Sequence, residues 1–232
     1  MDRLCLFLLV LVNLVGVLAQ QDLAGKVFVF AEASNMSHVV IKAALKKPLT
    51  SFTVCERVYT ELTRSFTTFS YATKASDNDI IIHKLNPTKY SLWLGRSHVT
   101  FDVPASQLKW EHVCVAWESA TGLAELWLNG VPLPRKGILR GYVVSHDASI
   151  VLGQDQDVMG GGFDIKDSFV GELKDVYMFD RVLSPEEIAL LMNNCFLHNA
   201  VINWRDFKYE IKGYVILKPY LPSAEVCGRP CF

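Results

Sequence analysis

The sequence of 232 residues carries little charge and no excess of either sign. It has 23 basic and 24 acidic side chains, a net charge of -1, 20% charged residues and 50% hydrophobic residues. This balance excludes a disordered chain, which would be rich in charge and poor in apolar residues. Because no basic block is present, it also excludes a protein that binds nucleic acid through its net charge, and we expect no sequence-specific nucleic-acid partner.

Long apolar runs are also scarce, and the one that is present lies at the N-terminus. Arg3 precedes an almost wholly apolar stretch at 4–12, and small residues lead to Ala19 before Gln20. This layout is typical of a secretory signal peptide, and the run is shorter than the ~20 residues that span a bilayer. We predict a signal peptide at 1–19 and a secreted, extracellular protein with no membrane span; an uncleaved membrane anchor is the alternative.

Cysteine is infrequent, and secretion decides how it is interpreted. Cys5 is one of six cysteines and leaves with the leader, so an odd number remains and at least one thiol is free or pairs with another chain. Cys55 and Cys114 each lie in a stretch that resembles a buried strand, which suits a core disulfide between them. Three cysteines near the C-terminus could instead form a zinc site, although no histidine lies at usable spacing around the tail. They are Cys195, Cys227 and Cys231.

Short β-branched or aromatic stretches, separated by turn residues, make up most of the remaining chain. They lie at 26–30, 38–43, 52–59, 69–73, 79–83, 90–94, 112–117, 124–128, 142–144, 149–152, 169–177, 201–204 and 209–217. This spacing is typical of an antiparallel sandwich or jelly roll. Asn129 and Gly130 form the dipeptide of a two-residue hairpin turn. We predict an all-β, two-sheet sandwich in one domain at 20–221, followed by a tail at 222–232.

One segment has a helical pattern. Ser184 and Glu187 form a capping box, with Pro185 in the first turn. Ile188 and Leu191 then recur at helical spacing. We predict one short helix of about ten residues on an otherwise all-β body.

Two stretches concentrate oxygen-bearing side chains. The turn at 76–79 is Ser-Asp-Asn-Asp, and the loop at 154–167 holds four carboxylates, two amides and three consecutive glycines, with a single lysine. Such oxygens are the ligands of a hard cation, and roughly six to eight of them select Ca²⁺. Asp155 and Asp157 point the same way in an extended chain, so both could reach one ion. The alternative is a solvated acidic loop with Asx-turns.

The stretch at 112–119, His-Val-Cys-Val-Ala-Trp-Glu-Ser, resembles the pentraxin signature His-x-Cys-x-Ser/Thr-Trp-x-Ser/Thr. Ala116 departs from it, where a hydroxyl residue is usual. Further similarities follow in the family's order at 25–30, 69–73, 152–157, 183–188 and 203–204. The resemblance covers essentially all of 23–219, and within the family the chain is similar to the short pentraxins.

The resemblance implies a lectin-like jelly roll with a helix on one face and two Ca²⁺ ions per subunit on the other. Asp155 stands where a longer Glu is typical and Asp167 where Gln is typical, so the affinity and geometry of the site are expected to differ from the family's. Asp164 falls where some members place another acid. The family's disulfide would be the pair Cys55 and Cys114. Carried over to matching positions, the calcium ligands are Asp77, Asn78, Asp155, the backbone carbonyl of Gln156, Asp157 and Asp167.

The resemblance also implies a ligand site. In pentraxins the calcium pair holds a phosphate or carboxylate, and a neighbouring pocket binds the rest of the ligand. The matching pocket positions are His83, Trp93 and His98, with His98 where an acid would meet a choline cation. Because histidine is a poor partner for a quaternary ammonium group, we predict phosphoethanolamine, anionic saccharides and phosphorylated microbial or damaged-cell surfaces in preference to phosphocholine.

Short pentraxins form cyclic, usually five-fold rings that act in innate immunity and engage complement, so the resemblance implies a cyclic homo-oligomer. Such a ring multiplies weak binding through multivalency. The family pattern does not account for the C-terminal cysteines, and we predict one bond from the tail to Cys195 and one thiol that links subunits. Asn35 begins the glycosylation sequon Asn-Met-Ser, with an unmodified loop as the alternative.

Two other classes share the predicted strand plan. A jelly-roll glycoside hydrolase would use Asp155 and Asp157 as its paired carboxylates. However, adjacent acids on one face beside amides look like shared metal ligands, and no hydrolase motif such as Gly-x-Ser-x-Gly is present. A laminin-G-like adhesion or carrier module is the other alternative. A lone secreted domain with paired acidic loops favours the recognition protein, and we expect no enzyme.

Overall fold

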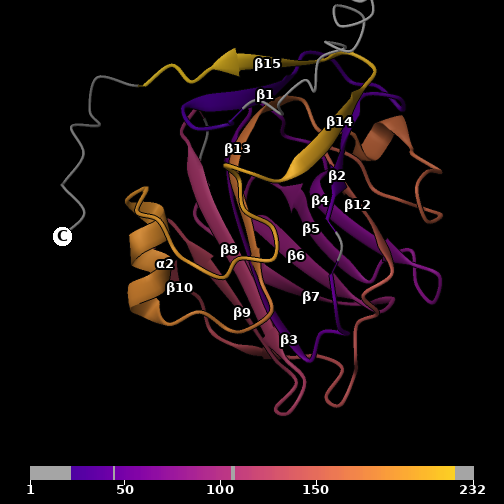
Figure 1. The fold of residues 1–232 in the computed structure, drawn as a ribbon, viewed down its shortest axis with the longest axis vertical. Coiled ribbons are helices and arrows are strands. Elements are labelled where there is room, and N and C mark those ends of the chain that lie inside the picture. Colours follow the sequence, from indigo (N-terminus) through magenta and orange to yellow (C-terminus); the bar gives the residue numbers. More distant parts are fainter. Residues whose placement is uncertain (1–21, 44, 106–107, 223–232) are drawn as a thin grey trace, which may run out of the picture.

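Two antiparallel sheets pack face to face and carry an α-helix on one outer surface (Figure 1). The fold is given by a computed structural model that describes residues 22–43, 45–105 and 108–222. The predicted all-β jelly-roll sandwich with one short helix is confirmed for these residues. The predicted leader at 1–19 and the tail cysteines Cys227 and Cys231 lie outside them.

The first sheet has the strand order β10-β9-β8-β3-β13-β1-β15, and β11 also pairs with β9. Cys55 of β3 lies directly opposite Cys114 of β8, and the predicted disulfide joins them. The strands are β1 (Lys26–Phe30), β3 (Ser51–Tyr59), β8 (Glu111–Glu118), β9 (Leu123–Leu128), β10 (Val131–Pro132), β11 (Lys136–Gly137), β13 (Gly171–Phe179) and β15 (Val215–Pro219).

The second sheet has the order β14-β2-β12-β4-β5-β6-β7. Strands β4 to β7 follow one another in both sequence and space, so they form a meander. The strands are β2 (His38–Lys42), β4 (Phe66–Thr73), β5 (Ile80–Asn86), β6 (Lys89–Leu94), β7 (Ser97–Asp102), β12 (Ala148–Leu152) and β14 (Lys208–Lys212).

The core lies between the sheets because alternate residues of each strand point inward. On β3, Phe52 and Val54 belong to this core, whereas Cys55 faces outward into a second, smaller cluster under the helix. Trp117 of β8 and Tyr71 of β4 are among its largest fully buried side chains. The alternation therefore fixes which faces remain for function, namely the two outer ones.

The helix α2 (Pro185–Met192) packs on the outer face of the first sheet. The predicted capping box is confirmed: the Ser184 hydroxyl accepts a hydrogen bond from the Glu187 amide at 3.3 Å, and the Glu187 carboxylate accepts one from the Ser184 amide at 2.9 Å. Ile188 and Leu191 pack against the disulfide and Trp127. Local capping and a narrow apolar stripe thus suffice to place the helix.

The predicted hairpin at Asn129-Gly130 is confirmed between β9 and β10, with φ angles of 51° and 77°. The predicted strand at 209–217 is wrong as a single element, because β14 belongs to the second sheet and β15 to the first. Gly213 makes the crossing with φ 64°, and a Cβ there would lie 2.8 Å from the Ser37 Cα. Only glycine fits so close an approach at positive φ.

Three other strand assignments also differ from the prediction. The segments at 142–144 and 201–204 form only isolated bridges, from Val144 to Leu49 and from Ile202 to Met178. The edge strand β7 was not predicted, although Val99 and Phe101 alternate with polar residues along it. No helix within the described ranges is long and apolar enough to cross a membrane.

Candidate metal centre

The loop between β12 and β13 is anchored to the outer face of the second sheet by Gln156. This side chain is fully buried, and its amide nitrogen donates hydrogen bonds to Ser70 and to the Ser149 carbonyl, each at 3.1 Å. Its amide oxygen accepts a bond from the Gly160 amide at 2.8 Å. The side chain is therefore structural, and only the backbone carbonyl of Gln156 is left for the predicted ligand role.

The glycines fold this loop back on itself. Val158 and Gly161 exchange two backbone hydrogen bonds, of 3.3 and 2.9 Å. Gly162 has φ 76°, and a Cβ there would lie 3.0 Å from the Cβ of Asp157. The chain thus turns tightly beside Asp157, which explains why glycines interrupt so acidic a stretch.

The far end of the loop is fixed by a 3-10 turn, η1 (Ile165–Asp167), and by Arg64. The Arg64 guanidinium donates to the carbonyls of Lys166 and Ser168 at 2.9 and 2.8 Å. The Ser65 hydroxyl donates to the Asp167 carboxylate at 3.2 Å. Asp164 caps the turn by accepting a bond from the Lys166 amide at 2.9 Å. Sequence reasoning missed Arg64 and Ser65, because their partners lie about a hundred residues away.

The acidic turn between β4 and β5 brings its residues to the same site. Asp77 and Asn78 are half-buried, and Asp77 accepts a hydrogen bond from the Asn78 amide at 3.1 Å. Asp79 has a different role: it is fully buried, and its carboxylate accepts bonds from Thr73 at 2.8 Å and Tyr142 at 2.5 Å. Asp79 therefore braces the turn, and its two neighbours are free to serve a ligand.

Electrostatic coupling links four of the predicted ligands, Asp77, Asp155, Asp157 and Asp167. Burial, together with the charges of Asp167, Asp157 and Asp77, raises the pKa of Asp155 to about 7. Burial, Asp167 and Asp77 also raise the pKa of Asp157. The charges that act on both groups are carboxylates, so the part of the chain that the structure describes supplies no countercharge to Asp155 or Asp157. We call Asp77, Asn78, Asp155, Asp157 and Asp167 the loop cluster.

Two oxygens of the loop cluster are left without partners. Among the described residues, the side-chain oxygens Oδ1 of Asn78 and Oδ1 of Asp155 are buried and make no hydrogen bond. A buried polar atom without a partner costs about 1–3 kcal/mol, so native structures rarely leave one unexplained. One amide oxygen and several mutually repelling carboxylates are a donor set suited to a hard divalent cation. The residues present therefore fit Ca²⁺.

The three predicted pocket residues lie on the same outer face as the loop. Trp93 lies opposite Ile81 on one side and His98 on the other, and the Trp93 and His98 rings stack at 4.3 Å. His83 is buried, and its Nδ1 lies 2.8 Å from the Thr67 hydroxyl oxygen. Burial lowers the pKa of His83, while the charge of Asp167 opposes that shift, which links this side chain to the loop cluster.

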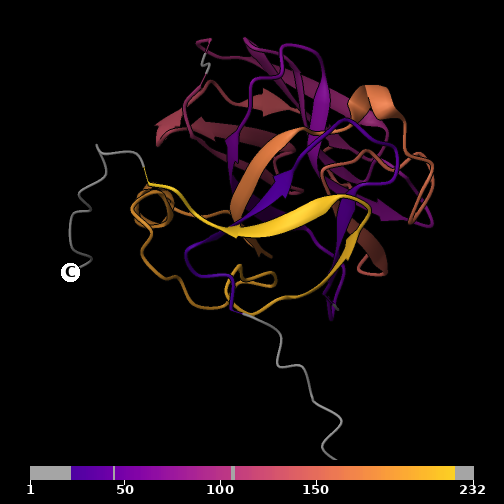
Figure 2. The same ribbon diagram turned by 90° about the horizontal axis from the view of Figure 1, so that it is seen from above.

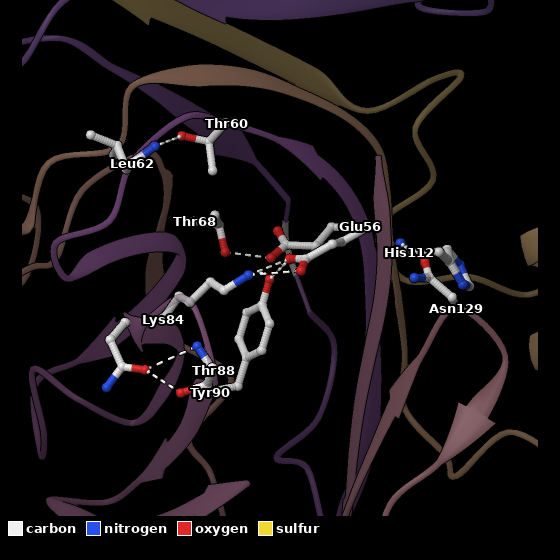
Figure 3. Close-up of polar contacts among 11 residues, drawn as sticks. Glu56, Thr60, Leu62, Thr68, Lys84, Thr88, Tyr90, His112 and Asn129 are labelled. Atoms are coloured by element: carbon white, nitrogen blue, oxygen red, sulfur yellow. Dashed lines mark hydrogen bonds and ion pairs between the residues drawn. The ribbon is translucent and has the colours of Figure 1, made fainter. Parts of the chain in front are cut away.

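A second set of polar residues, which sequence reasoning did not find, lies inside the sandwich (Figure 3). Lys84 of β5 donates to both oxygens of Glu111 at 2.8 and 2.6 Å, and the Tyr90 hydroxyl donates to the same carboxylate at 2.5 Å. The Thr68 hydroxyl donates to Glu56. We call these five residues the interior cluster. Its sequence signal is a charged residue on the inward face of a strand whose other inward residues are apolar, as for Glu56, Glu111 and Lys84.

Burial raises the pKa of Glu56 to about 8, and the hydrogen bond from Thr68 opposes this shift. The other oxygen of this carboxylate, Oε2, has no partner among the described residues. The remaining members are well paired, because Lys84 and Glu111 are each about 4% exposed and lie 2.6 Å apart. The interior cluster is thus a structural network between the sheets.

Three cysteines and the sequon can also be placed. Cys55 and Cys114 lie near His112, but their sulfurs are joined to each other and are not available as thiolate ligands. Cys195 is buried near the end of α2 and takes part in a disulfide. Asn35 is exposed in the loop between β1 and β2, where a glycan could be accommodated.

Comparison with known proteins places the chain in one family. The model of the Pentaxin family matches residues 26–219. The chain is 46% identical over 220 residues to serum amyloid P-component of Sus scrofa, with 94% of this chain and 98% of the relative covered. It is 44% identical over 221 residues both to mucosal pentraxin of Bos taurus and to C-reactive protein of Sus scrofa, with 95% of this chain and at least 99% of each relative covered.

Solved structures give the same fold at lower identity. A heptameric pentraxin from Limulus polyphemus, described as similar to serum amyloid P-component, matches with a TM-score of 0.77 and 24% identity, over 86% of this chain and 97% of the other. Domains LG4-5 of mouse laminin α1 match with a TM-score of 0.54 and 15% identity, over 72% and 45%. The laminin-G strand plan is therefore shared as a fold, while the sequence matches identify the chain as a member of the pentraxin family.

Proposed function

We propose that this pentraxin is a secreted, calcium-dependent recognition protein that binds phosphorylated or anionic ligands. The family consists of pattern-recognition proteins of innate immunity, which are not enzymes. Secretion is supported by the leader-like sequence at 1–19 and by relatives whose names place them in serum. Two Ca²⁺ ions per subunit would occupy the loop cluster, together with the backbone carbonyl of Gln156.

The observation that carries this proposal is the pair of buried, unpartnered oxygens on Asn78 and Asp155. They come from two separate loops, and carboxylates surround them without a basic side chain among the charges that act on Asp155. A divalent cation would accept both oxygens and neutralise the repulsion. Asp164 already caps η1 through one oxygen, so we assign it at most a supporting role through the other.

Ligand preference would follow from the neighbouring surface. Bound calcium attracts phosphate or carboxylate oxygens, whereas the stacked Trp93 and His98 offer an aromatic wall without an acid. A quaternary ammonium group gains most from an acid or an aromatic cage. We therefore expect phosphoethanolamine and anionic saccharides to bind more tightly than phosphocholine.

Assembly would supply avidity. Relatives of this family are oligomeric, and the Limulus structure is a heptamer; for this chain we propose a cyclic homopentamer. Several weak sites on one face of a ring can raise the overall affinity by about 10²–10⁴ for a surface with repeated ligands. The opposite face would remain available for humoral partners such as complement components. A glycan on Asn35 would lie on an exposed loop and leave this arrangement unchanged.

The test is calcium-dependent capture on immobilised phosphoethanolamine. The full-length secreted protein should bind in millimolar Ca²⁺ and elute with EDTA, and Asp155→Asn should not bind. Asp102→Asn is the matched control, because Asp102 is an exposed acid paired with Lys89 at 3.0 Å and lies at the end of β7 opposite to the one near the 76–79 turn. Capture that persists in EDTA, or equal capture by Asp155→Asn, would refute the proposal.

A further inference from the structure

An aromatic hollow lies beside α2 on the outer face of the first sheet. Its volume is about 740 Å³, and we define it by Tyr59, Trp110, Lys174 and Tyr220. Trp110 stacks on Tyr59 at 5.5 Å, and the Lys174 nitrogen lies 3.4 Å from the centre of the Tyr220 ring. Leu108 and Leu221 line it while 60% and 78% exposed. Exposed apolar side chains gathered in one hollow are typical of a contact surface.

A smaller cysteine hollow of about 200 Å³ adjoins the aromatic hollow, and we define it by Leu191, Cys195 and Trp204. The two hollows share Lys174 and Tyr220 in their walls. They therefore form one strip, which runs from the exposed Leu221 at one end to the buried Cys195 at the other. Figure 2 shows the yellow segment after β15 ending beside the orange helix α2, at the start of this strip.

Cys195 points to what covers the strip. Its sulfur is in a disulfide, and Cys55 and Cys114 are bonded to each other. The chain has three other cysteines, of which Cys5 lies in the predicted leader and the others lie in the tail, at Cys227 and Cys231. In a mature chain the tail supplies the intrachain partner.

The tail begins at the wall of the aromatic hollow. Pro222 lines the aromatic hollow, and the five residues from there to Cys227 span at most about 17 Å at ~3.4 Å each. Val226 and Pro230 are apolar groups that suit aromatic walls. Glu225 is the first charge beyond Pro222 and is opposite in sign to Lys174.

We propose that residues 223–232 dock along the aromatic hollow and are fastened to Cys195 by a disulfide. The tail would thus be a strap over the α2 face, opposite the proposed calcium face. Bond formation removes two protons and two electrons from the two thiols, and a disulfide oxidant of the secretory pathway accepts them and becomes a dithiol. The second tail cysteine remains available for a bond to a neighbouring subunit.

A peptide map of the unreduced wild-type protein tests the covalent step. We expect a peptide that contains Cys195 to be linked to one that contains Cys227 or Cys231. Because the proposed bond lies within one chain, the linked pair should be recovered from the unreduced monomer. A Cys195 joined to another chain, or left as a thiol, would overturn the proposal. This map needs no variant and no calcium, so it fails or succeeds independently of the proposed function.

Hydroxyl-radical footprinting tests the docking step in the wild type, in Cys195→Ser and in a chain that ends at Pro222. We expect labelling of Trp110 and Tyr220 to rise severalfold in the shortened chain and to a smaller extent in Cys195→Ser. Tyr214 is the internal control, because it is 51% exposed away from the strip. Unchanged Trp110 labelling in a shortened chain that retains the wild-type circular dichroism would overturn the docking.

Discussion

The interior cluster and the loop cluster place carboxylates in buried positions but neutralise them in different ways. Inside the sandwich, Glu111 receives two hydrogen bonds from Lys84 and one from Tyr90. At the surface, the Oδ1 atom of Asp155 has no hydrogen-bond partner among the described residues, and only other acids act on it. The interior cluster therefore contains its own cation, whereas the proposed calcium site in the loop cluster would take one from solution.

The difference shows how burial and charge together indicate function. Raised carboxylate pKa values occur in both clusters, so a shifted pKa alone does not distinguish structure from binding. What distinguishes them is the neighbouring charge, which is the cation Lys84 beside Glu111 in the interior cluster and other acids around Asp155 in the loop cluster. The interior cluster holds two sheets together, and the loop cluster holds two loops near each other at an electrostatic cost that an ion would remove.

The largest effect is expected from Lys84→Met. Loss of this cation leaves Glu111 buried and poorly paired, which destabilises the fold by about 3–5 kcal/mol. Urea unfolding would measure the change. Lys89→Met is the control, because Lys89 pairs with the exposed Asp102 at 3.0 Å and should cost less than about 1 kcal/mol. Recovery of stability in Lys84→Met/Glu111→Leu would confirm that the uncompensated charge is the cause, and no recovery would contradict it.

The second-largest effect is expected from Asp155→Asn in the loop cluster. This change should stabilise the calcium-free protein, whereas Lys84→Met destabilises the fold. Asp155→Asn should weaken Ca²⁺ binding by at least tenfold, about 1.4 kcal/mol, because one charged ligand is lost. The same change removes repulsion, so the calcium-free protein should melt at a higher temperature than the calcium-free wild type. Calorimetry and thermal scans in EDTA would measure both quantities. A lower melting temperature in EDTA would show that Asp155 is stabilising without an ion.

The third effect is the pH dependence of stability that Glu56 of the interior cluster contributes. The pKa of Glu56 is raised from 4.5 to about 8 in the folded protein, so the folded state keeps a proton that the unfolded state releases. The stability that Glu56 contributes is therefore complete below pH 4.5 and is lost as the pH rises to about 8. Glu56→Gln should flatten this decline in urea unfolding between pH 5 and 8. An unchanged slope would mean that another group titrates.

The smallest effect is expected from Ser65→Ala. Its hydroxyl positions Asp167 through one hydrogen bond of 3.2 Å, and losing one such bond costs about 0.5–1.5 kcal/mol. Ca²⁺ affinity should fall by a few-fold with little change in stability in EDTA. Ser97→Ala, on the edge strand β7, is the matched control. Equal affinity in both variants would remove Ser65 from the site.

The sequence predicts the features that rest on neighbouring residues. The hairpin at Asn129 and the capping box at Ser184 are both confirmed, because their hydrogen bonds close within a few residues. Crossings between sheets are not predictable in this way. Nothing in the apolar pattern at 209–217 shows that Gly213 sends β14 and β15 into different sheets, since that depends on the contact with Ser37.

The same distinction applies to the sites. The acids of the loop cluster are dense in sequence and could be found there, but Arg64 and Ser65 could not, because they act on residues about a hundred positions away. Asp79 appears equivalent to Asp77 in sequence, yet it braces the turn through Tyr142. The interior cluster combines strands from both sheets, so it becomes visible only when the strands are paired.

The central claim is that the loop cluster lacks a cation which calcium supplies, and a direct Ca²⁺ titration tests it most simply. Isothermal calorimetry of the metal-free, full-length protein at pH 7.5 should show two ions per subunit, with affinities of about 10⁻⁴–10⁻³ M as in extracellular modules. Asp155→Asn should lose at least one of these ions. If no binding is detected at a Ca²⁺ concentration about ten times the larger of these dissociation constants, the account is contradicted.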